Sequence, residues 1–334
     1  MTNVMIKEGT YKIRGKETCM QGLVFPLVEE FKVGAGGGYV TVDGSAVNGF
    51  PARNIKIKVS GVRDYTVVGD EVAATIVEES DTEIVERIRE RFDMLKDMTK
   101  AVKKGDVRAM IVSGPPGVGK SHGVEEVLDR YDTVAALGGS NKYEVVKGAM
   151  SPIGLYCKLF NYADKDNVIV FDDCDAVFDE PLALNILKAA LDSKKKRMIH
   201  WNTDSYKLRN EGVPDSFEFK GSAIFITNIK FDNVKSPKMR DHLSALESRC
   251  HYIDLAIDTD REKLLRIKQI TNDGMLNEYK LSEETVQDIV DFVDINKKRL
   301  RELSLRTVLK VADLAKAFPD KWEAMAENTV MRRG

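Results

Sequence analysis

Hydrophobic and polar positions follow three different patterns along the chain, and the changes between them divide it into three regions. Residues 1–78 contain short β-prone stretches interrupted by glycines and an Asn-Gly turn, which predicts a small β-rich N-terminal domain. Over 79–256, apolar runs alternate with segments of helical spacing, which is typical of an α/β fold with a mostly parallel sheet and helices on both faces. Over 257–334 only helical spacing remains, which predicts a C-terminal helical lid.

The same patterns predict the individual elements. Strands of the N-terminal region are expected at 10–14, 39–42, 54–59 and 65–68. Strands of the central region are expected at 109–113, 143–147, 168–172, 223–227 and 251–255. Helices are expected at 82–104, 121–131, 259–270, 282–294, 304–317 and 319–328, the first of them dense in charges along one face.

Two segments depart from these patterns. Residues 197–202 and 216–220 are β-prone and flank a polar loop, so we expect an inserted β-hairpin at about 197–220 that carries Trp201. This hairpin either contacts a substrate or packs on its own domain. The glycine-rich run 34–38 looks like part of a dinucleotide fingerprint, but no helix follows it, so we interpret it as a loop or hairpin tip.

Candidate chemistry begins with a loop of the pattern G-x-x-x-x-G-K-[ST], which follows an apolar strand and precedes a helix. Its glycines let backbone N–H groups turn inward around phosphates, and the helix N-terminus favours an anion. Lys120 supplies a charge to the β- and γ-phosphates, and the Ser121 hydroxyl can bind Mg²⁺. The loop consists of Gly114, Pro115, Pro116, Gly117, Val118, Gly119, Lys120 and Ser121.

Polar residues follow two of the buried strands. Asp172 and Asp173 end the apolar run 168–172, where the carboxyl edge of a parallel sheet would bring them to the phosphates. We expect Asp172 to hold Mg²⁺, in part through water, and Asp173 to orient or deprotonate the attacking water. Asn228 ends the next strand and could bind that water or the γ-phosphate. Asp175 and Glu180 are reserve candidates for the acidic roles.

Composition excludes several other classes of protein. The chain of 334 residues has 43% hydrophobic and 31% charged residues, no apolar run long enough to cross a bilayer and no signal-like start, so we expect a cytoplasmic protein without membrane contact. Its four cysteines have no metal-like spacing. The net charge of −2 argues against a globally basic nucleic-acid binder. The basic runs 194–197 and 297–299 could contact nucleic acid or could be solvated helix ends.

From about 79 to 330 the order of these features resembles the AAA+ ATPase family. The resemblance implies that 114–121 is the Walker A loop, Asp172-Asp173 the Walker B acids and Asn228 the sensor-1 residue. It also implies a ring-like homo-oligomer, such as a hexamer or pentamer. The sequence around Asp172 and over 184–193 is similar to that of ATPases from tailed bacteriophages. This resemblance implies that the protein is located in the host cytoplasm.

Two arginines acquire roles from this resemblance. Ser248-Arg249-Cys250 is similar to the S-R-C motif of clamp loaders, in which the arginine reaches into the neighbouring subunit's site. An arginine supplied in this way is worth roughly 10³–10⁵ in rate, because charge develops on the γ-phosphate oxygens. Arg240 is the reserve candidate. Arg306, at the start of a lid helix, resembles the sensor-2 arginine.

The expected function is ATP hydrolysis at subunit interfaces, coupled to remodelling or loading of a protein or DNA target. ATP is preferred to GTP because an Asn-Lys-x-Asp guanine reader is missing, and Mg²⁺ is the expected cofactor. The family's Walker B usually ends Asp-Glu, whereas Asp173 is one methylene shorter. That departure keeps open a nucleotide-gated scaffold with little hydrolysis. A monomeric small-molecule kinase is a further alternative.

Overall fold

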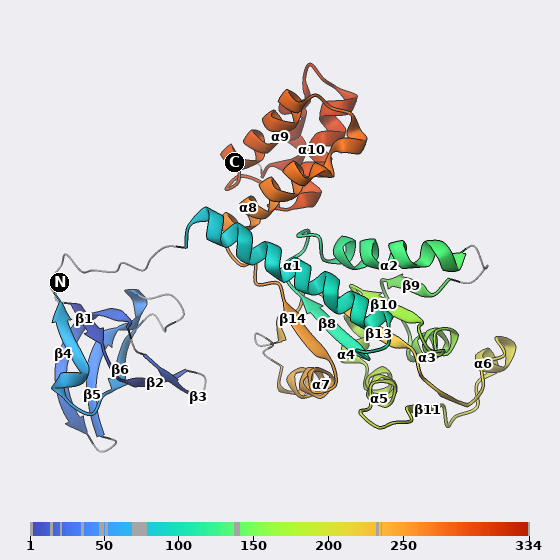
Figure 1. Ribbon diagram of the computed structural model, residues 1–334, viewed down its shortest axis with the longest axis horizontal. Coiled ribbons are helices and arrows are strands. Elements are labelled where there is room, and N and C mark those ends of the chain that lie inside the picture. Colours follow the sequence, from blue (N-terminus) through green and yellow to red (C-terminus); the bar gives the residue numbers. More distant parts are fainter. Residues whose placement is uncertain are drawn as a thin grey trace. The chain divides into compact units, whose positions relative to one another are not determined.

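The computed structural model describes residues 3–332, apart from 14–15, 21, 35–36, 47–49, 51–52, 69–78, 137–140, 232–233 and 235. The chain forms two compact units, Met1–Ser80 and Asp81–Gly334 (Figure 1). Within the described residues, no helix has the length and apolar character needed to cross a membrane.

The N-terminal unit is a seven-stranded antiparallel sheet with the order β3-β2-β6-β5-β4-β1-β7. Strict alternation explains strand β6, because Ile55 and Ile57 are buried while Lys56 is exposed. The predicted β-rich character of this region is therefore confirmed. Its strands are β1 (Asn3–Ile6), β2 (Thr10–Ile13), β3 (Lys16–Cys19), β4 (Val24–Gly34), β5 (Gly37–Asp43), β6 (Asn54–Lys58) and β7 (Tyr65–Val68), with short 3₁₀ turns at Gly44–Ala46 and Val62–Asp64.

Three of these strands, β1, β3 and β4, were not predicted from the sequence. The register between β4 and β5 shifts twice, between Leu27 and Glu29 and again before Lys32, so the period-two pattern of β4 is interrupted. The glycine-rich run is a hairpin tip, as interpreted: Gly34 ends β4 and pairs with Gly37 at the start of β5, and no helix follows.

The second unit is built on a five-stranded parallel sheet with the order β14-β8-β13-β10-β9. Every residue of its three central strands is buried, which explains their unbroken apolar sequences. The five predicted strands are present with ends within one residue of those expected. They are β8 (Ala109–Ser113), β9 (Tyr143–Lys147), β10 (Val168–Asp172), β13 (Ser222–Thr227) and β14 (His251–Asp254).

Helices cover both faces of this sheet (Figure 1). Helices α1 (Asp81–Lys103) and α2 (Lys120–Ala136) pack on one face, against side chains such as Val170. Helices α3 (Pro152–Asn161), α5 (Pro181–Ala190) and α7 (Pro237–Glu247) pack on the other, against side chains such as Phe171. The predicted α/β fold, a phosphate loop on a parallel sheet between two helical layers, is confirmed.

A small insertion precedes β13. Strand β11 (Met198–His200) pairs antiparallel with β12 (Ser216–Glu218), and the expected polar loop between them contains a short helix, α6 (Tyr206–Asn210). Trp201 is half-buried with its ring centroid 5.5 Å from that of Tyr156, so it packs on its own domain. Arg197, from the basic run, is also buried and donates to the Ala190 and Gly221 carbonyls.

The rest of the unit is helical, which confirms the predicted C-terminal helical region. Serine and threonine side chains cap three of its helices, because Thr259, Ser282 and Ser304 each accept a hydrogen bond from the first turn. The Arg87 guanidinium, on α1, lies 2.8 Å from the Glu262 carboxylate at the start of this region. The elements of this region are α8 (Asp260–Ile270), a π turn (Thr271–Met275), a 3₁₀ turn (Asn277–Tyr279), α9 (Glu283–Ile295), α10 (Leu305–Ala317) and α11 (Trp322–Val330). One further short helix, α4 (Ala176–Asp179), lies between β10 and α5 in the sequence.

Candidate nucleotide-binding site

Strand order brings the candidate residues to one edge of the sheet. Strand β13 lies between β8 and β10, with Thr227 beside Ser113 and Ile226 beside Asp172. All three strands are parallel, so the phosphate loop, Asn228 and the acids meet at their carboxyl ends. This is the edge at which open α/β sheets bind ligands.

The phosphate loop connects β8 to α2, and two of its glycines are sterically required. Gly117 and Gly119 have φ angles of 69° and 99°, a region that other residues rarely adopt. A Cβ on Gly117 would lie 2.6 Å from the Ser304 Cβ, at the start of α10. The Leu305 N–H also donates to the Gly117 carbonyl at 2.9 Å. The lid therefore docks directly on the loop.

Lys120 is buried at the start of α2, with a relative exposure of 6%. Its Nζ donates to the carbonyls of Gly114 and Pro115, at 2.8 and 2.9 Å, and to Asn228 Oδ1 at 2.7 Å. Burial lowers its pKa to about 8, an effect opposed by the negative charges of Asp173 and Asp172. The ammonium is thus fixed by the protein's own acceptors.

The two acids differ in their surroundings. Asp172 is 5% exposed, and its Oδ2 lies 3.4 Å from the Lys147 Nζ. Asp173 is exposed, with φ at 53°, and its Oδ1 accepts a hydrogen bond from Asn228 Nδ2 at 2.8 Å. Asn228 therefore joins Lys120 to Asp173, its amide oxygen facing the cation and its amide nitrogen the carboxylate. Aspartate adopts such a left-handed backbone more readily than most residues, and strain of this kind is common at functional sites.

The oxygen atoms at this edge suit a magnesium ion bound together with a nucleotide. Mg²⁺ takes one or two protein oxygens and completes its octahedron with phosphates and water. The Asp172 carboxylate and the Ser121 hydroxyl are the donors of this kind that the sequence singled out. Among the described residues there is no group of three or more His, Cys, Asp or Glu side chains that could hold a metal alone.

The reserve acids are placed differently. Asp175 is half-buried, burial raises its pKa, and its Oδ1 has no hydrogen-bond partner. Its charge also acts on Lys120, so it lies near the same edge of the sheet. Glu180 is exposed immediately before α5 and does not join this group.

The two candidate arginines also lie in different places. Arg306 is exposed in the first turn of α10, and its charge contributes to the lowered pKa of Lys120, so the lid brings it to the phosphate loop. Arg249 is exposed after α7, and donates to Ala245 O at 2.6 Å and Ser248 Oγ at 3.3 Å. It precedes β14, one of the two edge strands, and the structure does not bring it to Lys120. Arg240 donates to the Val234 carbonyl.

Comparisons with known proteins identify a phage relative. No family model matches the chain. An uncharacterized 36.7 kDa protein of Enterobacteria phage T4, from the nrdC-mobD intergenic region, is 35% identical over 260 residues, which cover 77% of this chain and 78% of the relative. The chain belongs to the family of this T4 protein.

Solved structures with similar chain traces include a replication initiation protein and an ORC2 protein. Domain III of the Thermotoga maritima replication initiation protein DnaA has a TM-score of 0.43 and 10% identity over 72% of this chain and 92% of its own. The Aeropyrum pernix ORC2 protein has a TM-score of 0.42 and 13% identity over 74% of this chain and 68% of its own.

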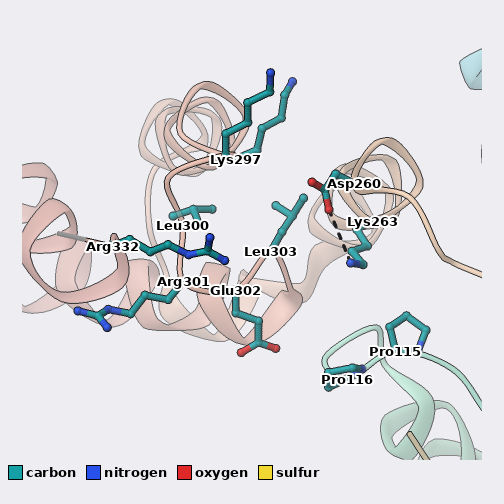
Figure 2. Close-up of a pocket in the computed structure, with 11 residues that line it drawn as sticks. Pro115, Pro116, Asp260, Lys263, Lys297, Leu300, Arg301, Glu302, Leu303 and Arg332 are labelled. Carbon is teal, nitrogen blue, oxygen red and sulfur yellow. Dashed lines mark ion pairs between the residues drawn. The ribbon is translucent and has the colours of Figure 1, made fainter. Parts of the chain in front are cut away.

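In this member of the T4 protein's family, a cavity of about 390 Å³ lies beside the phosphate loop (Figure 2). Pro115 and Pro116 form one wall, and the lid forms the other. Two of the lid's cations are paired with acids, Lys263 with Asp260 and Lys297 with Asp294. The lid residues of the wall are Asp260, Lys263, Lys297, Lys298, Leu300, Arg301, Glu302, Leu303 and Arg332. Two residues of the basic run 297–299, Lys297 and Lys298, thus line the same cavity as Pro115 and Pro116 of the phosphate loop.

Sequence reasoning missed two basic residues of this site. Lys147 ends β9, next to the acid strand, and bridges Asp172 to Glu125, whose Oε1 lies 3.1 Å from its Nζ. The rule that found Asn228, a polar residue after a buried strand, does not find Lys147, because β9 is only partly buried. Arg266 is buried in α8 beside the loop, and no sequence signal indicates its burial.

Proposed function

We propose that the protein is a Mg²⁺-dependent ATPase of the AAA+ type, which binds nucleotide at the loop 114–121. The observation that carries this proposal is the hydrogen-bonded chain from Lys120 through Asn228 to Asp173, beside the buried Asp172. A cation for phosphates, an amide and two carboxylates at the end of a parallel sheet are the groups that phosphoryl transfer uses.

In this proposal each residue has a separate task. Backbone N–H groups of the loop and Lys120 hold the β- and γ-phosphates, and Arg306 approaches them from the lid. Ser121 and Asp172 hold Mg²⁺, which neutralises charge on the phosphate oxygens. Asp173 accepts a proton from the attacking water. Asn228 keeps the Asp173 carboxylate oriented through its 2.8 Å hydrogen bond.

Arg249 completes the site of a neighbouring subunit in the proposed assembly. Its exposure beside the edge strand and its distance from its own Lys120 network support an action in trans. The assembly is a ring-like homo-oligomer, a hexamer or pentamer, in the host cytoplasm. Its ATP turnover remodels or loads a DNA or protein target in phage DNA metabolism.

A nucleotide-gated scaffold is the second candidate, and one observation favours it. Asp173 is shorter than the glutamate usual in the resembling family, and its Oδ1 is already engaged by Asn228. A carboxylate held in this way would be a poor base for water. In this case ATP would drive assembly and recruitment with little hydrolysis.

Steady-state phosphate release, with and without single- and double-stranded DNA, tests the proposal. We expect turnover above about 0.01 s⁻¹, itself low for an enzyme, and loss of turnover with retained nucleotide binding in Asp172→Asn. Retained binding with no turnover in the wild type would favour the scaffold. Absence of nucleotide binding in the wild type would reject both.

A further inference from the structure

Arg266 is a buried cation of the lid whose hydrogen-bonding capacity is largely unused. It lies on α8 with a relative exposure of 7%. Its Cζ is 3.5 Å from the centre of the Phe92 ring, on α1, and Nη1 donates to Gln269 Oε1 at 2.8 Å. Its Nε is buried without a hydrogen-bond partner. A guanidinium has five N–H donors, and leaving one buried and unpaired is costly.

The guanidinium also lies against the phosphate loop. A Cβ placed on Gly119 would be 3.9 Å from Arg266 Nη2, 4.0 Å from the Phe92 ring and 3.6 Å from Leu305. A Cβ on Gly123, in the first turn of α2, would be 3.8 Å from the same ring. Arg266 and Phe92 therefore form a stack that borders the turn between the loop and its helix.

This charge has no nearby counter-ion in the described residues. Burial lowers its pKa to about 10, an effect opposed by the negative charges of Asp273 and Asp93, but neither of these carboxylates forms an ion pair with it. An unpaired buried charge is strongly unfavourable unless another group compensates it. The ligand expected at the adjacent loop carries several negative charges.

We propose that Arg266 is a nucleotide-binding residue of the lid, and that the phosphates of the bound nucleotide are its missing counter-ion. This inference rests on the proposed function, because it requires nucleotide at the loop. Binding then compensates a charge that the free protein leaves unpaired. Arg266 thereby couples occupancy of the core to the position of the lid, through a helix separate from the one that carries Arg306.

The decisive variant is Arg266→Met, which keeps a long side chain over Phe92 and removes the charge. We expect affinity for ADP and ATP to fall about 10- to 100-fold, the range for a hydrogen bond to a charged group. We also expect a shallower decrease of affinity with rising KCl, because one fewer charge is screened. The Tm of the nucleotide-free protein should be unchanged or higher, since an uncompensated charge has been removed.

The control is Arg261→Met on the same helix, an exposed arginine paired with Asp81. It should leave affinity and salt dependence at wild-type values. Arg266→Lys should keep the salt dependence, and Arg266→Gln replaces the methionine variant if that variant does not fold. Wild-type affinity or wild-type salt dependence in Arg266→Met would overturn the inference, as would a Tm below that of Arg261→Met.

Failure of the proposed function would look different. In that case the wild type and Lys120→Ala would both fail to bind nucleotide, and the Arg266 inference would fall with it. If the wild type binds nucleotide and Arg266→Met binds equally well, only the role of Arg266 is rejected.

Discussion

Two buried cations flank the phosphate loop, and they differ in how far the protein alone satisfies them. Lys120, from the core, and Arg266, from the lid, are 6% and 7% exposed. The Lys120 ammonium has three oxygen acceptors within 2.9 Å, whereas the Arg266 guanidinium has one, Gln269 Oε1, at 2.8 Å. The two side chains are equally buried, but the protein supplies three hydrogen-bond acceptors to Lys120 and one to Arg266. The core side of the site is preorganised, while the lid side depends on its ligand.

The difference follows from what surrounds each group. Lys120 is enclosed by carbonyls of its own loop and by the polar end of β13, all fixed by the sheet. Arg266 reaches the loop only because α8 and α10 dock on it, and its main neighbour is an aromatic ring. A ring face attracts a cation, but it does not accept the guanidinium's in-plane hydrogen bonds.

A third cation, Arg249, extends the comparison, and its replacement has the largest expected effect, which is on ATP turnover. It is exposed and bonded only within its own helix end, so it contributes little to the isolated subunit. We expect Arg249→Ala to reduce turnover by roughly 10³-fold or more, as for other arginines supplied in trans, while nucleotide affinity changes by less than about threefold.

Mixed oligomers give the sharpest measurement of this effect. Arg249→Ala subunits keep an intact loop and acids, and Asp172→Asn subunits keep Arg249. Mixing the two inactive variants should restore part of the phosphate release, because some interfaces combine the intact halves. Full activity of Arg249→Ala alone would contradict the role in trans, and Arg240→Ala tests the reserve candidate on the preceding helix.

Lys120→Ala should abolish the preorganised side of the site. Removing the ammonium also leaves Asn228 Oδ1 and two loop carbonyls without their donor. We expect nucleotide affinity to fall by about 100-fold or more, measured by titration with a fluorescent nucleotide analogue. Lys120→Arg retains the charge but not the compact geometry, so its affinity should lie between the two. Wild-type affinity in Lys120→Ala would place the nucleotide elsewhere.

These cations also show how much of the site the sequence could predict. Lys120 was found from the glycine-rich motif to which it belongs, and Asp172, Asp173 and Asn228 were found because they stand at the ends of buried strands whose carboxyl ends share one edge. Arg266 could not be found, because the segment Asp260–Ile270 reads as a charged surface helix and only docking of the lid buries it.

The same limit applied elsewhere in the fold. The strands of the parallel sheet were predicted almost to the residue, since burial on both faces makes their sequences continuously apolar. Strand β4 was missed because its register shifts break the alternation. Arg197 belongs to a run that reads as a basic patch, yet it is buried with two carbonyl acceptors. Tertiary contacts, which a local pattern does not encode, decided each of these cases.

The pH dependence of nucleotide binding should further distinguish the two buried cations, Lys120 and Arg266. With a pKa lowered by burial to about 8, Lys120 in the free protein loses its proton as pH rises above 8, whereas Arg266, at about 10, stays charged. Phosphates favour the charged form. Affinity should therefore fall as pH rises from 8 to 9.5, by up to about tenfold per unit, with uptake of a proton on binding.

Calorimetry in buffers of different ionisation enthalpy would measure that proton. Nucleotide phosphates, with a second pKa near 6, are already ionised in this range and do not obscure it. Arg266→Met should retain the proton uptake and Lys120→Arg should lose it. The unfolded chain holds the lysine proton up to about pH 10.5, so this group's linkage makes the free protein more stable as pH rises from about 8 to 10.5. Binding without proton uptake at pH 8.5 would contradict the assignment to Lys120.

The smallest expected effect, on Mg²⁺ affinity, is that of replacing Lys147, whose ammonium the protein pairs with two carboxylates. Its Nζ lies 3.1 Å from Glu125 and 3.4 Å from Asp172, the carboxylate proposed to hold the Mg²⁺ shell. A magnesium ion must therefore compete with this ammonium. Because Lys147 is largely exposed, the pair contributes about 0–1 kcal/mol.

We accordingly expect Lys147→Met to strengthen apparent Mg²⁺ affinity by no more than about fivefold, measured as the Mg²⁺ dependence of nucleotide binding. Glu125→Gln, which removes the other partner of Lys147, should have the opposite sign, because the freed ammonium turns to Asp172 alone. Weaker Mg²⁺ affinity in Lys147→Met would mean that Lys147 supports the carboxylate's orientation instead of competing for it, and would place Lys147 with Lys120 among the preorganised groups.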